Sequence, residues 1–167
     1  MQKVVITGHD LTVDQIIAVC REGAEVVLSD ESREKILASR QVVNELVEER
    51  KVVYGITTGF GKFSDVVISQ DECKLLQKNL IITHAVGAGD PFKEDIARGI
   101  LLLRVNSLSN GFSGICLETV ETMIAMLNKG VTPFIPEKGS LGASGDLAPL
   151  SHMVLPMIGL GMAWYKG

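Results

Sequence analysis

The sequence has 167 residues, of which 46% are hydrophobic and 22% charged, and its formal net charge is −4. The length suffices for one domain with a hydrophobic core, and the mean hydropathy of +0.27 predicts apolar surface that further protein covers. The acidic balance argues against a nucleic-acid partner, because binding of phosphates needs clustered Lys and Arg.

The first residues predict a small β element and a short helix. Val4 to Ile6 and Glu25 to Leu28 are apolar runs rich in β-branched residues that can pair as a small sheet. Between them, Asp10 or Thr12 can cap a short helix that ends at Gly23.

Five more helices are predicted by apolar periodicity and by capping signals. The first is expected at Asp30 to Lys51, and the second runs from a capping box at Ser69 to Ala85. The others run from the Asp90-Pro91 cap to Gly111, from Ser113 to Gly130, and from Asp146 onward as an apolar helix. Two glycine-rich loops, 52–65 and 131–145, interrupt the helices. The expected class is therefore mainly α, with a small β element and two flexible loops.

The second loop ends in Gly139-Ser140-Leu141-Gly142-Ala143-Ser144-Gly145-Asp146-Leu147. One interpretation is a glycine-rich turn before a helix that Ser144 or Asp146 caps. A serine hydrolase is disfavoured, because a nucleophile elbow needs glycine where Asp146 stands. The first loop does not match a phosphate-binding loop, because Phe63 stands where a Ser or Thr would contact magnesium.

Ala143-Ser144-Gly145 also permits a cyclisation. In a sharply bent backbone the amide nitrogen of Gly145 can attack the carbonyl carbon of Ala143, and loss of water leaves an imidazolone ring. Loss of the Ser144 hydroxyl as a second water then gives an exocyclic methylene, which is an electrophile made without an added cofactor. Glycine leaves its nitrogen unshielded, and the surrounding fold must hold such a strained bend.

Four segments together resemble motifs of the histidine and phenylalanine ammonia-lyase family, in the same order and at compatible spacing. They are Tyr54 to Gly61, Asn79 to His84, Leu103 to Leu108 and Gly139 to Leu150. The resemblance extends over essentially the whole chain. It implies that residues 1–167 are a single N-terminal region of a longer helical lyase, without that lyase's C-terminal helical part.

The resemblance also implies roles for the loop residues. Ala143, Ser144 and Gly145 would form the prosthetic group 4-methylideneimidazole-5-one (MIO), and Asp146 is expected to cap the following helix. Tyr54 would act as acid or base near the substrate β-carbon. Without the resemblance, a tyrosine beside a glycine is typical of a core or loop anchor. A phenol is a weak base near neutral pH, so this role requires a fold that stabilises its anion.

His84 would face the substrate side chain in such a lyase. By itself, a histidine at this place is typical of a helix end whose polar groups are already paired. Because an imidazole can form hydrogen bonds, His84 favours L-histidine as substrate over L-tyrosine, and both over L-phenylalanine.

The implied activity is conversion of L-histidine to trans-urocanate and ammonia, which makes the protein a carbon–nitrogen lyase of histidine catabolism. Tyrosine or phenylalanine ammonia-lyase and an aminomutase with the same electrophile stay open as alternatives. So does a non-catalytic helical interaction module that merely retains the loop.

The remaining expectations concern partners and location. The resemblance implies a homotetramer for the longer protein, and we expect the 167-residue chain alone to be inactive and to self-associate. Three dispersed cysteines indicate neither a disulfide framework nor a zinc site, and the three histidines show no metal-ligand spacing. The most apolar stretch, Leu147 to Met162, is too short to span a membrane, and no secretory signal is apparent, so we expect a cytoplasmic protein.

Overall fold

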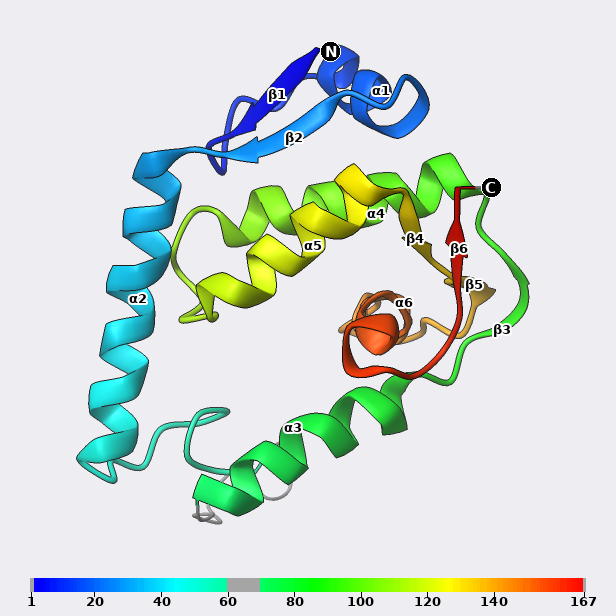
Figure 1. Cartoon of the computed structure of the whole chain (residues 1–167). Coiled ribbons are helices and arrows are strands. Elements are labelled where there is room, and N and C mark those ends of the chain that lie inside the picture. Colours follow the sequence, from blue (N-terminus) through cyan, green and yellow to red (C-terminus); the bar gives the residue numbers. More distant parts are fainter. Residues whose placement is uncertain (1, 60–69, 167) are drawn as a thin grey trace.

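The computed structural model describes residues 2–59 and 70–166, and this part of the chain is mainly helical, as expected (Figure 1). The helices are α1 (Val13–Arg21), α2 (Asp30–Glu48), α3 (Gln70–His84), α4 (Glu94–Leu108), α5 (Leu117–Lys129), α6 (Leu147–Val154) and the 3₁₀ helix η2 (Leu155–Ile158). The strands are β1 (Lys3–Ile6), β2 (Glu25–Leu28), β3 (Ala88–Pro91), β4 (Val131–Pro133), β5 (Pro136–Lys138) and β6 (Ala163–Tyr165).

The predicted N-terminal sheet and its helix are confirmed. β1 and β2 pair in parallel, with Val4 opposite Val26, and α1 forms the connection between them. Thr12 begins α1 through a capping box, in which its hydroxyl accepts from the Gln15 amide at 3.3 Å and the Gln15 side chain accepts from the Thr12 amide at 2.9 Å. Val4 and Val26 are buried, so one face of this sheet joins the core.

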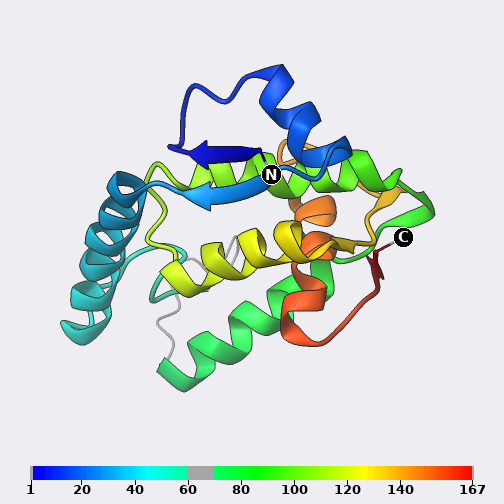
Figure 2. The same cartoon turned by 45° about the horizontal axis from the view of Figure 1, so that its top comes forward.

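The core lies where α4 and α5 pack against each other (Figures 1 and 2). Its fully buried apolar side chains from these two helices include Ala97, Leu101, Leu102, Val105 and Val120. α1 packs on α4, and β2 packs on α5. The predicted end of α5 is confirmed, because Gly130 adopts the left-handed conformation with φ 70° and caps the helix.

Two helices begin later than their local signals predict. Asp90-Pro91 does not open α4, which starts at Glu94, because Pro91 pairs with Pro136 in the β3–β5 ladder. Ser113 does not cap α5, because the segment before that helix packs on α2. There the Gly114 amide donates to Ser39 Oγ at 2.9 Å, and the Arg40 guanidinium donates to the Gly114 carbonyl at 3.2 Å. Tertiary contacts therefore override the local capping patterns.

The second glycine-rich loop is more ordered than predicted. Its residues include β4, which pairs with β6 in antiparallel fashion, and β5, which pairs with β3. The expected helix after it is confirmed as α6, which lies between the α4–α5 pair and α3 (Figures 1 and 2). The expected capping box at Ser69 and part of the first loop lie outside the described residues. No helix in the described ranges has the length and apolarity that a membrane span requires.

The buried Arg98 connects α4 to both α1 and α5. Its side chain is buried on α4, and its guanidinium donates to the carbonyls of Val19 at 2.9 Å and Leu127 at 3.2 Å. These carbonyls lie in the last turns of α1 and α5, where backbone acceptors lack partners within the helix. A cation at the negative ends of two helix dipoles adds a favourable charge interaction.

Replacing Arg98 with methionine is expected to lower the free energy of unfolding by about 2 to 4 kcal/mol, because two hydrogen bonds to a charged donor are lost in a buried place. Urea denaturation measures this loss. Arg21→Met is the matched control, because Arg21 is an exposed arginine whose ion pair with Asp95 at 2.9 Å is expected to contribute less than about 1 kcal/mol. Equal losses in the two variants would contradict this role for Arg98.

Candidate functional site

The loop that carries Ala143, Ser144 and Gly145 joins β5 to α6, and all three residues are exposed. Gly139 and Gly142 take positive φ angles of 128° and 101°, which glycine adopts without steric cost. The loop then turns into α6, where the Leu147 amide donates to the Ser144 carbonyl at 3.4 Å. The backbone before the tripeptide therefore depends on two glycines.

Asp146 occupies the N-cap position of α6, as predicted, but its side chain forms no capping hydrogen bond. Its φ and ψ of −104° and −7° are helical instead of extended, which is unfavourable for the usual capping geometry. The expectation that Asp146 caps the helix through its side chain is therefore wrong in this structure.

His84 is the last residue of α3 and is half-buried. Its Nδ1 lies 2.8 Å from the carbonyl oxygen of Leu80, one turn earlier in the helix. Because a carbonyl only accepts hydrogen bonds, Nδ1 carries the proton in this contact. A neutral His84 ring then has Nε2 as an acceptor, which is the form needed to receive a hydrogen bond from another imidazole.

The segment after His84 and the segment before the loop are held together, and we name their contact the Gly87–Gly139 junction, made of Gly87, Pro136, Gly139 and His152. β3 and β5 pair on one side of it, with Ala88 opposite Lys138. A Cβ on Gly139 would lie 2.8 Å from the Cα of Gly87, so the two backbones touch. The junction therefore brings the His84 end of α3 to the start of the Ala143–Gly145 loop.

His152 of α6 completes the junction, although no role was predicted for it. Its Nε2 accepts from the Gly87 amide at 2.9 Å. Burial lowers the pKa of His152 below its ordinary value, which favours the neutral ring that can accept this bond. Only weak signals in the sequence could have indicated this contact: His152 lies in an apolar helix, and Gly87 lies just after the end of α3.

Tyr54 lies on a different segment, in a turn after α2, and 61% of it is exposed. Thr57 builds this turn, because its hydroxyl accepts from the Val53 amide at 2.9 Å. Gly55, directly after Tyr54, has a φ of 74°. The structure thus joins His84 to the loop through the junction but does not place Tyr54 on the same elements.

Two adjoining hollows extend from the Tyr54 turn towards the loop. The first, of about 830 Å³, is lined by Gly55 and Ile56, and the second, of about 690 Å³, is lined by Leu147 at the start of α6. They share Gln77 of α3 and Arg104 of α4, so they form one groove along α3. Gly55, next to Tyr54, lines the first hollow, and Leu147, two residues after Gly145, lines the second.

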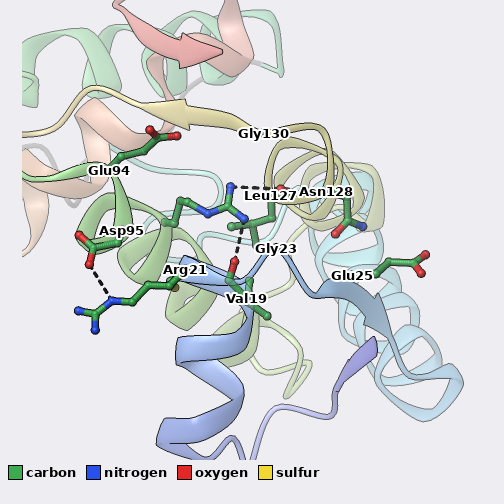
Figure 3. Close-up of a pocket in the computed structure, with 11 residues that line it drawn as sticks. Val19, Arg21, Gly23, Glu25, Glu94, Asp95, Leu127, Asn128 and Gly130 are labelled. Carbon is green, nitrogen blue, oxygen red and sulfur yellow. Dashed lines mark hydrogen bonds and ion pairs between the residues drawn. The ribbon is translucent and has the colours of Figure 1, made fainter. Parts of the chain in front are cut away.

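A further hollow, between α1, α4 and α5, has no such connection (Figure 3). Its polar groups pair with the protein itself, as Arg98 does with two carbonyls and Arg21 with Asp95. Burial raises the pKa of the Cys20 thiol in its wall, which disfavours the nucleophilic thiolate. Among the described residues, no cluster of three or more His, Cys, Asp or Glu side chains could hold a metal ion.

The chain is similar to a known protein family and to individual members of it. The family model described as "Aromatic amino acid lyase" matches residues 11–167. The histidine ammonia-lyase of Caldanaerobacter subterraneus subsp. tengcongensis is 61% identical over 167 residues, which are 100% of this chain and 33% of that protein. The chain therefore spans about a third of the length of the curated relatives it matches.

Solved structures of two different activities have the same fold. The structure of histidine ammonia-lyase from Trypanosoma cruzi matches with a TM-score of 0.91 and 42% identity, over 99% of this chain and 32% of that one. The tyrosine aminomutase of Streptomyces globisporus matches with a TM-score of 0.90 and 36% identity, over 99% of this chain and 31% of that one. The fold alone therefore does not distinguish deamination from amino-group migration.

Gly139→Ala is expected to lower the free energy of unfolding by about 3 kcal/mol, through overpacking against Gly87 and an unfavourable positive φ. Gly142→Ala is the matched control, since Gly142 also has a positive φ but a Cβ there would meet nothing within 4 Å. The control is expected to lose only about 1 kcal/mol. Urea denaturation compares the two, and equal losses would contradict a tight junction.

Proposed function

The chain belongs to the aromatic amino acid lyase family, and we propose that it is the N-terminal region, residues 1–167, of a lyase that converts L-histidine to trans-urocanate and ammonia. The observation that carries the proposal is the junction, which brings the His84 end of α3 to the loop that contains Ala143, Ser144 and Gly145. The identity of 61% to a histidine ammonia-lyase supports the choice of substrate.

The electrophile of this reaction would come from the loop. We propose that the Gly145 nitrogen bonds to the Ala143 carbonyl carbon with loss of one water, and that Ser144 loses its hydroxyl as the second. The exposed tripeptide fits this chemistry, because Gly145 has no Cβ to shield its nitrogen and Gly142 frees the backbone before Ala143 to bend. The MIO group so formed supplies an electrophile that makes the substrate easier to deaminate.

His84 would bind the substrate side chain. With Nδ1 donating to Leu80, its Nε2 can accept a hydrogen bond from the imidazole N–H of L-histidine or the hydroxyl of L-tyrosine. The phenyl ring of L-phenylalanine has no such donor and would leave His84 unpaired. Because of this difference in hydrogen bonding to His84, we propose L-histidine as the substrate, with L-tyrosine second and L-phenylalanine third.

Tyr54 would remove the proton from the substrate β-carbon, with its phenolate as the base. It adjoins the groove that leads to the loop, through Gly55 and Ile56. Its exposure in this chain means that further protein must cover it before the phenolate can act away from water.

An aminomutase is the second candidate, because the tyrosine aminomutase of Streptomyces globisporus shares this fold. Such an enzyme would return ammonia to the β-carbon, so its product is a β-amino acid instead of an unsaturated acid. Product analysis with L-histidine, L-tyrosine and L-phenylalanine in parallel separates the two activities.

We also propose that the full-length protein is a cytoplasmic homotetramer that acts in histidine catabolism. Large apolar side chains on this chain are exposed, among them Leu141 at 97% and Phe112 at 91%. Large apolar side chains left this exposed support a surface that other protein covers on assembly.

Ser144→Ala in the full-length protein is expected to abolish the second dehydration and to lower kcat with L-histidine by more than about a thousandfold. Intact mass checks the chemistry. The wild type should be lighter than its sequence mass by two waters, whereas the variant should not lose the second water. Ser107→Ala, at an exposed serine of α4, is the matched control and should behave as wild type. A fully active wild type with an unmodified mass would refute the proposed electrophile.

His84→Leu is expected to lower kcat/KM for L-histidine by about ten- to a hundredfold, because one buried hydrogen bond to the substrate is lost. The value for L-phenylalanine should change little, since its ring makes no such bond. Urocanate and cinnamate absorbance measure both reactions. Equal losses for the two substrates would argue that His84 does not select the side chain.

A further inference from the structure

We propose that His152 is a positioning residue, which holds the His84 end of α3 in register with the Ala143–Gly145 loop. The inference rests on the proposed function, because it concerns where a substrate side chain sits relative to the electrophile. Nothing in it requires that His152 touch the substrate.

The position of His152 in the chain makes such a role possible. It lies on α6, the helix that directly follows the loop, so the helix backbone connects it to the loop. Its partner Gly87 is three residues beyond His84, in the short segment between α3 and β3. One hydrogen bond, from the Gly87 amide to His152 Nε2 at 2.9 Å, thus connects the two halves of the site.

Close packing gives this bond little freedom. A Cβ on Gly87 would lie 2.9 Å from His152 Nε2 and 3.0 Å from Pro136, so the ring and the proline fill the space beside Gly87. The β3–β5 ladder starts only at Ala88, after the contact. The Gly87 amide therefore depends on a side chain of the right length and with an acceptor at its tip.

The hydrogen bond also determines which nitrogen of the His152 ring carries the proton. Nε2 must be unprotonated to accept, so the proton of neutral His152 is on Nδ1. Burial shifts the pKa of His152 downward, which favours this neutral form. A glutamine side chain can place its amide oxygen near the position of Nε2 and accept the same hydrogen bond without a titratable group.

Loss of the acceptor should affect binding more than electrophile formation. Gly139 still contacts Gly87, and β5 still leads into the loop, so the loop keeps its own anchors. The segment just after His84 would instead lose its hydrogen bond to α6. The expected consequence is a substrate side chain held less firmly, which appears in KM and not in the extent of dehydration.

The test uses the full-length protein with His152→Leu and His152→Gln, and with His9→Leu and His9→Gln as matched controls at an exposed histidine. We expect His152→Leu to raise KM for L-histidine about tenfold, the effect of one lost hydrogen bond. The mass loss of two waters should stay complete, and His152→Gln should restore KM to within about threefold of wild type. Both His9 variants should match wild type.

Two results would overturn the proposal: a wild-type KM in His152→Leu, or a His152→Gln variant as impaired as His152→Leu. If His152→Leu does not fold, His152→Asn replaces it, because its shorter side chain cannot reach the Gly87 amide. Hydrogen exchange at that amide should be slow in wild type, His152→Gln and both His9 variants, and fast in His152→Leu and His152→Asn. Failure of the proposed function gives a different pattern, in which the wild type forms no urocanate and retains both waters.

Discussion

The contact between two short backbone segments, at Gly87 and Gly139, is the constraint on which the candidate site depends. Neither segment belongs to a long strand or helix. The missing side chain of Gly139 lets the backbone of Gly87 approach, and the missing side chain of Gly87 leaves room for His152 and Pro136. The β3–β5 pair fixes the direction of approach, and His152 adds a hydrogen bond from α6. Through this contact, a helix end and a loop that are far apart in sequence become neighbours.

The core is built separately from this contact. The α4–α5 pair buries the main apolar cluster, and Arg98 joins it to α1 through carbonyl groups at helix ends. The core takes Ile135 from the start of the second glycine-rich loop but no residue from 139–145, so that last part can carry positive φ angles and exposed residues while the core provides stability. Such a division is typical of enzymes, where mobile or strained loops are held by a rigid scaffold.

Local signals in the sequence predicted the elements that local forces determine. The capping box at Thr12 and the glycine that ends α5 are short-range features, and both are present. Asp90-Pro91 is also a sound local capping signal, yet it lies in a strand, because pairing with Pro136 depends on residues far away in sequence. The role of His152 escaped prediction for the same reason, since its partner Gly87 lies 65 positions away.

The motif around Ser144 indicated the chemistry, but the geometry adds a condition that the motif does not contain. An electrophile made from Ala143, Ser144 and Gly145 would react with water unless its surroundings exclude it. In this chain the tripeptide is exposed, and so is Tyr54, whose neighbour Gly55 lines the groove. The chain therefore holds the residues that we propose to react and the junction beside them, whereas we expect the enclosure to come from protein packed over the groove. That requirement is the physical reason why we propose a longer, oligomeric enzyme instead of a self-sufficient catalytic domain.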